Sequence, residues 1–135
     1  MKIFLDENFS KYIAEALNCF QKGYRSEDVE VLHIAERFGI GSPDEEWIPQ
    51  VAQMHGVILT EDANIYRQRS QYALCQECKV GIFFFRPPKK QSFTYWQWVE
   101  IVMKHWSSVK SIAKDAKRPF AFEITPHTKT PKIMS

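Results

Sequence analysis

Cysteine, glycine and long apolar runs are all scarce in this sequence. Its 135 residues include 3 cysteines and 5 glycines, too few glycines for a collagen-like chain. A small, odd number of cysteines argues against a disulfide framework and indicates a reducing, cytoplasmic compartment. The longest apolar run, residues 81–85, is far shorter than the ~20 residues of a membrane span, and Asp6 follows Met1 too soon for a signal peptide. We therefore expect a cytoplasmic protein without a membrane partner.

The composition is that of an ordinary globular chain, but its charge is unevenly divided. Hydrophobic residues make up 44% and charged residues 25% of a length that suits one domain. Residues 1–67 carry a net charge of −6 and residues 68–135 a net charge of +8. This division indicates either a self-complementary surface or a cation site beside a face that binds polyanions.

Short apolar segments alternate with helical patterns along the chain. The alternation predicts one parallel, doubly wound α/β domain over residues 1–125 and a loose tail over 126–135. The first strand should be central because both of its faces are apolar, and the last strand should lie at an edge. We expect strands near 2–5, 29–34, 57–60, 80–85 and 120–124, and helices near 10–23, 42–56, 65–75 and 92–113.

Local signals refine two of these helices. Ser42 should cap the second helix, with Pro43 in its first turn and Glu45 completing a capping box. In the last helix we expect Trp96 and Met103 to pack inward, and Trp98 to lie off the apolar stripe and face a partner. The Cys75–Cys78 pair has no second pair or spaced histidines, so we interpret both cysteines as structural.

Acidic residues follow two of the predicted strands and begin the helix between them. They occupy residues 6–7, 44–46 and 61–62, and the carboxyl ends of parallel strands share one edge of a sheet. Two carboxylates ~5 Å apart repel by about 3 kcal/mol at an effective dielectric near 20, so such a cluster needs a cation. Oxygen ligands suit Mg²⁺ or Mn²⁺ better than zinc. The acids at 44–46 and at 61–62 could each also serve to cap a helix, whereas Asp6 is the hardest of them to explain as structural.

Three segments together resemble the PIN-like nucleases, in particular a compact branch of that family. They are Leu5-Asp6-Glu7-Asn8-Phe9-Ser10, Gly39-Ile40-Gly41-Ser42-Pro43-Asp44-Glu45-Glu46 and Val57-Ile58-Leu59-Thr60-Glu61-Asp62. The resemblance covers residues 1–90 and implies a metal-dependent endoribonuclease that cuts single-stranded RNA, often the toxin of a toxin–antitoxin pair. It implies Asp6, Asp44 and Asp62 as ligands of Mg²⁺ or Mn²⁺, and Glu45 as a substitute for Asp44 or a helper to it.

Basic and amide side chains near these acids are candidates for substrate contacts. Arg67 and Arg69 begin the helix after Asp62, and Arg86 follows the fourth strand, where they would hold phosphates. Asn8 and Asn64 complete the substrate-binding set that we expect. Chains of this branch commonly carry an aspartate at the position of Asn64. The amide of Asn64 therefore removes one negative charge from the metal site.

Two other functions fit parts of the sequence. The first is a PIN-like module that binds RNA or protein with weakened catalysis, as Asn64 suggests. The second is a receiver-type signalling domain, for which Asp6, Thr60 and Lys79 give a superficial match, although the 29–34 strand lacks the acceptor aspartate. An antitoxin protein and a second copy of the chain are the expected protein partners.

Overall fold

The protein is described by a computed structural model that covers residues 1–61, 65–88 and 91–134, without the side chains of residues 65–68. In these residues, six strands form one sheet in the order β2-β1-β3-β4-β5-β6. The first five strands are parallel, and β6 pairs antiparallel with β5. Their bounds are β1 Lys2–Leu5, β2 Glu30–His33, β3 Val57–Glu61, β4 Gly81–Phe85, β5 Phe120–Ile124 and β6 Lys132–Ile133. The predicted parallel α/β fold is confirmed.

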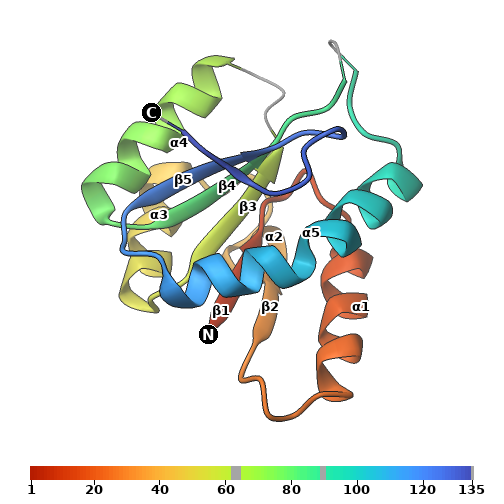
Figure 1. Ribbon diagram of the computed structural model, residues 1–135. Helices are drawn as coiled ribbons and strands as arrows, with labels where there is room; N and C mark the ends of the chain where they lie inside the picture. The colour runs from red at the N-terminus through yellow and green to blue at the C-terminus, as the bar shows by residue number, and fades with distance from the viewer. Residues whose placement is uncertain (62–64, 89–90, 135) are drawn as a thin grey trace.

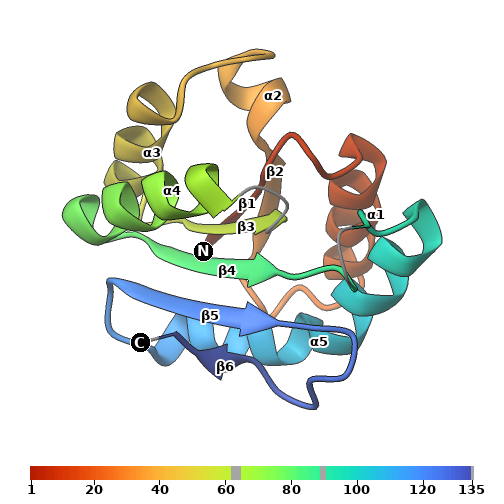
Figure 2. The same ribbon diagram turned by 90° about the horizontal axis from the view of Figure 1, so that it is seen from above.

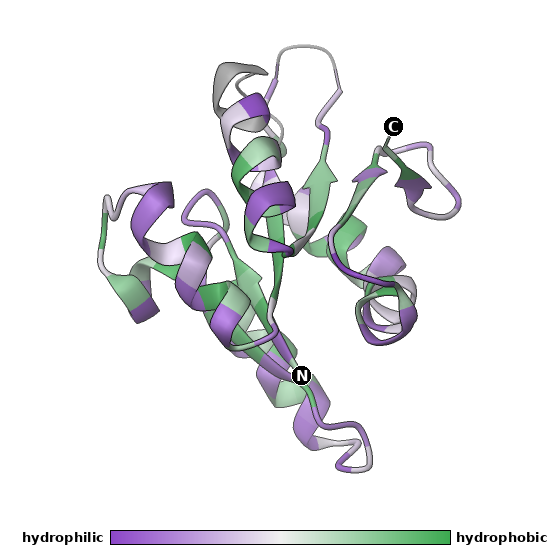
Figure 3. Cartoon of the chain, turned by 90° about the vertical axis from the view of Figure 1, so that its left-hand side faces the viewer, coloured by the Kyte–Doolittle hydropathy of each residue, from purple (hydrophilic) through white to green (hydrophobic). Residues whose placement is uncertain are grey.

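Two helical layers cover the sheet (Figures 1 and 2). One face carries α1 and α5, and the other carries α2, α3 and α4, as the two buried apolar clusters also show. Figure 3 shows hydrophobic colour on the strands between these layers and hydrophilic colour on the outer helix surfaces. The bounds are α1 Lys11–Lys22, α2 Ile34–Phe38, α3 Asp44–Gln53, α4 Ile65–Cys78 and α5 Tyr95–Asp115.

The strand β1 is internal to the sheet, as its composition predicted. Successive side chains of a strand point to opposite faces. Ile3 and Leu5 accordingly belong to the cluster under α1 and α5, and Phe4 belongs to the cluster under α3 and α4. All three side chains are fully buried. The residue that follows Leu5 is therefore delivered to the middle of the carboxyl edge of the sheet.

The inward face of α5 differs from the one that we predicted. Trp98 is 5% exposed, whereas Trp96 is 74% exposed and Met103 also faces solvent. The ring of Trp98 packs on the rings of Phe9 and Phe93, at centroid distances of 4.1 and 4.5 Å. Phe9 comes from a distant segment and Phe93 from the residues just before α5, and together they fix the phase of the helix against the sheet. The expectation that Trp98 faces a partner is wrong.

The start of α3 also differs by one residue from the prediction. Pro43 occupies the N-cap position with an extended ψ of 144°, and no side chain caps the helix. Because Pro43 is not helical, Ser42 lies one residue too early to act as the N-cap. The predicted capping box of Ser42 and Glu45 is wrong, and Glu45 is an exposed residue of the first turn.

The segment expected to form a loose tail contributes to the sheet. Lys132 and Ile133 pair with Glu123 and Phe122 of β5, and the N–H of Met134 donates to the carbonyl of Ala121 at 2.8 Å. The strand β5 is therefore covered on both sides, and β6 is the edge strand. This correction concerns the far side of the sheet from β1.

Candidate metal and substrate site

Asp6 lies directly after β1 and is 0% exposed. Its backbone N–H donates to the carbonyl of Leu59 at 2.9 Å, which extends the pairing of β1 with β3 by one residue. The side chain therefore sits between two central parallel strands at their carboxyl ends. In open α/β sheets this edge is where ligands bind.

Within the described residues, the carboxylate of Asp6 accepts hydrogen bonds from three donors. Oδ1 accepts the backbone N–H of Glu7 at 2.7 Å. Oδ2 accepts the hydroxyl of Thr60 at 2.6 Å and the side-chain amide of Gln71 at 3.3 Å. Thr60 comes from β3 and Gln71 from α4, and both are buried. Hydrogen bonds of this kind commonly orient carboxylates that bind metal ions.

Thr60 and Gln71 were missing from the candidate site residues predicted from sequence. Thr60 belongs to the segment that resembles the PIN-like pattern, so its position carried a signal. The sequence signal for Gln71 was weak. Gln71 lies four residues before the buried Cys75, a spacing that puts both residues on the inner side of α4. Its contact with Asp6 is a tertiary contact across 65 residues.

Asp44 is the first residue of α3 and is partly buried. Burial raises the pKa of the Cys75 thiol to about 12, and the charges of Cys78 and Asp44 contribute to this shift. Asp44 therefore lies within electrostatic reach of Cys75, one helical turn beyond Gln71. Asp44 begins α3, and α3 and α4 cover the same face of the sheet, the face toward which the Asp6 side chain points.

A second acidic group, Glu61, ends β3 beside Asp6. Burial raises the pKa of its carboxyl group, and the charge of Asp6 adds to that effect, while hydrogen bonds from Ser92 and the backbone of Phe93 oppose it. Its Oε1 atom is buried without a hydrogen-bond partner among the described residues. Ser92 and Phe93 precede α5, so Glu61 points toward the opposite face of the sheet from Asp6.

The loops around Asp6 are joined by a short contact. The N–H of Gly41 donates to Oε2 of Glu7 at 3.2 Å, and Gly41 has a positive φ of 74° that favours glycine. This bond connects the turn after β1 with the loop that leads to Asp44. Asn8 and Glu45 are both exposed near this rim.

Of the remaining candidate site residues, some lie within the described residues and some lie outside them. Arg69 is exposed on α4, and Arg86 is exposed directly after β4, where its guanidinium pairs with Glu123 at 3.1 Å. Asp62 and Asn64 lie outside the described residues, as does the side chain of Arg67. In the part of the chain that the structure describes, no three His, Cys, Asp or Glu residues form a metal cluster.

The chemistry of the described donors fits a hard cation. Asp6 and Asp44 offer carboxylate oxygens, which Mg²⁺ and Mn²⁺ prefer. Burial raises the pKa of the Cys75 thiol to about 12, so this thiol is protonated at neutral pH and is no thiolate ligand for zinc. None of the described helices is long and apolar enough to cross a membrane.

The fold and the buried aspartate at its carboxyl edge define a parallel α/β protein with an acidic site at the ends of its central strands. The family model of the PIN-like domain matches residues 1–87, and the chain belongs to this family. PIN domains are generally nucleases, which are hydrolases, so membership of this family indicates a nuclease-type module. The matched segment runs from β1 to the end of β4 and includes all three candidate ligands. No curated protein and no solved structure matches the chain.

Proposed function

We propose that the protein is a metal-dependent endoribonuclease that cuts single-stranded RNA. The observation that carries the proposal is Asp6: its carboxylate is fully buried at the carboxyl edge and oriented by donors from three segments. Asp44 begins α3, which lies in the same helical layer as α4. With Asp62, which follows β3 in the sequence, these residues would hold Mg²⁺ or Mn²⁺, and Glu45 would assist Asp44.

The side chains of the proposed site have different roles. A divalent cation held there supplies activation of a water molecule and stabilisation of negative charge on the phosphate. Thr60 and Gln71 keep the Asp6 carboxylate in one orientation. Arg69 and Arg86 are exposed near the rim and carry the charge that phosphates need. Arg67, Asn8 and Asn64 complete the proposed substrate contacts.

A role as the toxin of a toxin–antitoxin pair in the cytoplasm is the finer part of this proposal. An apolar surface between α1 and α5 supports a protein partner, either an antitoxin or a second copy. Phe20, Tyr95 and Met103 line it and are 61%, 45% and 42% exposed. Exposed aromatic groups of this kind are enriched at protein interfaces. Light scattering of the purified protein, together with a search for a co-purifying protein, tests this part.

Asn64 favours a second candidate function, a PIN-like module with weakened catalysis. An amide in place of a carboxylate removes one negative charge from the proposed ligand set, which weakens the attraction for a divalent cation. If the site is weakened in this way, Asn64→Asp should raise Mn²⁺ affinity and cleavage rate about tenfold. Unchanged cleavage in this variant would favour the fully active enzyme.

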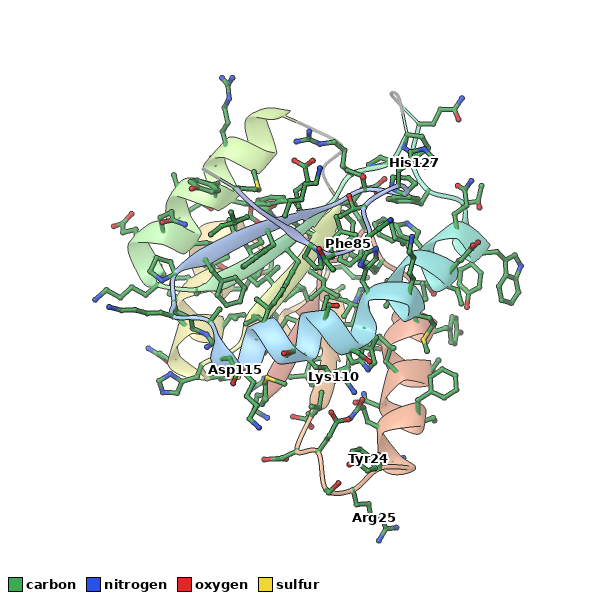
Figure 4. All side chains as sticks on the ribbon, in the orientation of Figure 1. Tyr24, Arg25, Phe85, Lys110, Asp115 and His127 are labelled. Atoms are coloured by element: carbon green, nitrogen blue, oxygen red, sulfur yellow. The ribbon has the colours of Figure 1, made fainter. Side chains whose placement is uncertain are left out.

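The main test compares cleavage of a labelled single-stranded RNA in Mn²⁺ and in EDTA. We expect Asp6→Asn and Asp62→Asn each to reduce cleavage at least about 100-fold, because a cation site loses a charged ligand. The matched control is Asp115→Asn, the same change at the far end of α5 (Figure 4). It should cut at the wild-type rate.

Melting temperatures complete the test. A ligand that binds only the folded state stabilises it by mass action, so Mn²⁺ should raise the melting temperature of the wild type but not of Asp6→Asn. If Asp6→Asn and Asp62→Asn both cut RNA as fast as the wild type, the proposal is overturned. Cleavage that persists in EDTA would overturn its metal dependence.

A further inference from the structure

A small cavity of about 210 Å³ lies beside the carboxyl edge, between α5 and the segments that follow β4 and β5. Apolar atoms of Pro88, Phe93, Ile101 and Pro126 form much of its wall. Cavities that hold drug-sized ligands are larger, roughly 300–1,000 Å³. The space therefore suits one planar ring system, and its apolar walls suit the faces of such a ring.

A series of packed residues connects the cavity with the proposed catalytic site. Phe93 packs on Trp98, Trp98 packs on Phe9, and the N–H of Phe9 donates to the backbone carbonyl of Asp6 at 2.9 Å. Glu61, next to Asp6, is hydrogen-bonded to the backbone of Phe93. An RNA strand whose phosphate lies at the acidic edge therefore passes close to this cavity.

One face of α5 presents polar groups to the cavity. Gln97, Glu100 and Lys104 line it, at spacings of three and four residues that share a helix face. Oε1 of Gln97 accepts the N–H of Thr94 at 2.9 Å in the helix cap, which leaves its amide N–H₂ as the group for a ligand. Glu100 and Lys104 are exposed, and within the described residues neither of them forms an ion pair.

These groups match the Watson–Crick edge of guanine. Guanine presents two adjacent donors, N1–H and N2–H, beside the acceptor O6, and a carboxylate accepts both donors at once. Adenine and cytosine place an acceptor beside their amino group, and uracil offers one N–H. Proteins that read RNA sequence commonly bind unpaired bases along this edge.

We propose that this cavity binds one unpaired guanine of the RNA substrate. Glu100 accepts N1–H and N2–H of the base, and the amide of Gln97 or the ammonium of Lys104 donates to O6. The apolar walls cover the two faces of the ring. This assignment deepens the proposed ribonuclease function and depends on it for the identity of the ligand as RNA.

The test measures binding without cleavage. Fluorescein-labelled hexamers of uridylate, each with one central guanine, adenine or cytosine, are titrated with the protein in EDTA and followed by anisotropy. We expect the wild type to bind the guanine hexamer about tenfold more tightly than the other two, the discrimination typical of one bidentate contact. Glu100→Gln should lose this preference, because an amide cannot accept both N–H groups.

The control is Glu15→Gln, the same charge change on an exposed residue of α1, which should keep the preference. Equal binding of all hexamers, preference for another base, absence of binding, or a guanine preference that survives in Glu100→Gln would each overturn the assignment. Cleavage is mapped separately in Mn²⁺. Cleavage without base preference would support the nuclease function and overturn the guanine site. Guanine-selective binding without cleavage would support the guanine site and overturn the nuclease function.

Discussion

Two carboxylates lie near each other at the carboxyl edge of the sheet but on opposite faces, and their surroundings differ. Asp6 faces α4 and accepts hydrogen bonds from Glu7, Thr60 and Gln71. Glu61 faces the segment before α5, and its Oε1 is buried without a partner in the described part of the chain. Burial raises the pKa of Glu61, and the charge of Asp6 adds to the shift.

The difference shows which of the two groups the fold orients. The described donors to Asp6 come from the turn after β1, from β3 and from α4. Hydrogen bonds from these three segments together fix the orientation of its carboxylate. Glu61 has weaker support and sits beside another acid, which disfavours its charged form. Asp6 therefore has the surroundings of a ligand, and Glu61 those of a carboxyl group held at a cost in stability.

The variant that most directly tests the difference between Asp6 and Glu61 is Thr60→Val. It keeps the side-chain shape and removes the 2.6 Å hydrogen bond to Asp6. We expect Mn²⁺ affinity and RNA cleavage to fall 10–100-fold, as losses of such supporting contacts do. The free energy of unfolding should fall by about 2 kcal/mol, typical of a hydrogen bond to a charged group. Calorimetric titration with Mn²⁺ and chemical unfolding measure the two effects.

A matched variant separates stability from function. Thr125→Val removes the hydroxyl that contacts Thr128 near the same edge, after β5. It should lower stability and leave Mn²⁺ binding unchanged. Equal losses of Mn²⁺ affinity in Thr125→Val and Thr60→Val would show that Thr60 acts only through stability.

A second variant gives Asp6 an acidic neighbour like the one that Glu61 has. Gln71→Glu replaces the amide 3.3 Å from Asp6 with a carboxyl group. Two ionised groups at this distance repel by about 5 kcal/mol at an effective dielectric near 20, and protonation relieves part of the repulsion. We expect the melting temperature at pH 7 to fall by roughly 5–15 °C without a divalent cation, and Mn²⁺ to restore part of the loss.

Gln76→Glu is the control for this variant, because it makes the same charge change in the same helix. It should shift the melting temperature much less and gain nothing additional from Mn²⁺. If Mn²⁺ raised the melting temperature of Gln71→Glu no more than that of Gln76→Glu, the cation would not bind beside Asp6.

The sequence allowed the fold and part of this site to be predicted, for identifiable reasons. Apolar runs such as Ile3–Leu5 mark buried strands, and the parallel topology then places Asp6, the residue after β1, at the carboxyl edge of the sheet. The contact of Gln71 with Asp6 and the phase of Trp98 depend on packing between distant segments, which no local pattern encodes. The roles of Asp6, Asp44, Asp62 and Asn64 stay predictions.

The smallest expected effect concerns Glu61 and its pH dependence. The folded state raises the pKa of this carboxyl group, so the ionised form costs stability at pH values above the folded pKa, and the cost disappears below the unfolded value of about 4.5, where both states are protonated. Glu61→Gln should therefore raise the melting temperature by a few degrees at pH 7.5 and leave it unchanged at pH 4. Melting curves of the wild type and Glu61→Gln across this range test the expectation, with Glu77→Gln, an exposed acid on α4, as the control. A Glu61→Gln variant that melts below the wild type at pH 7.5 would mean that the ionised carboxylate is satisfied in the folded protein, and the contrast with Asp6 would not hold.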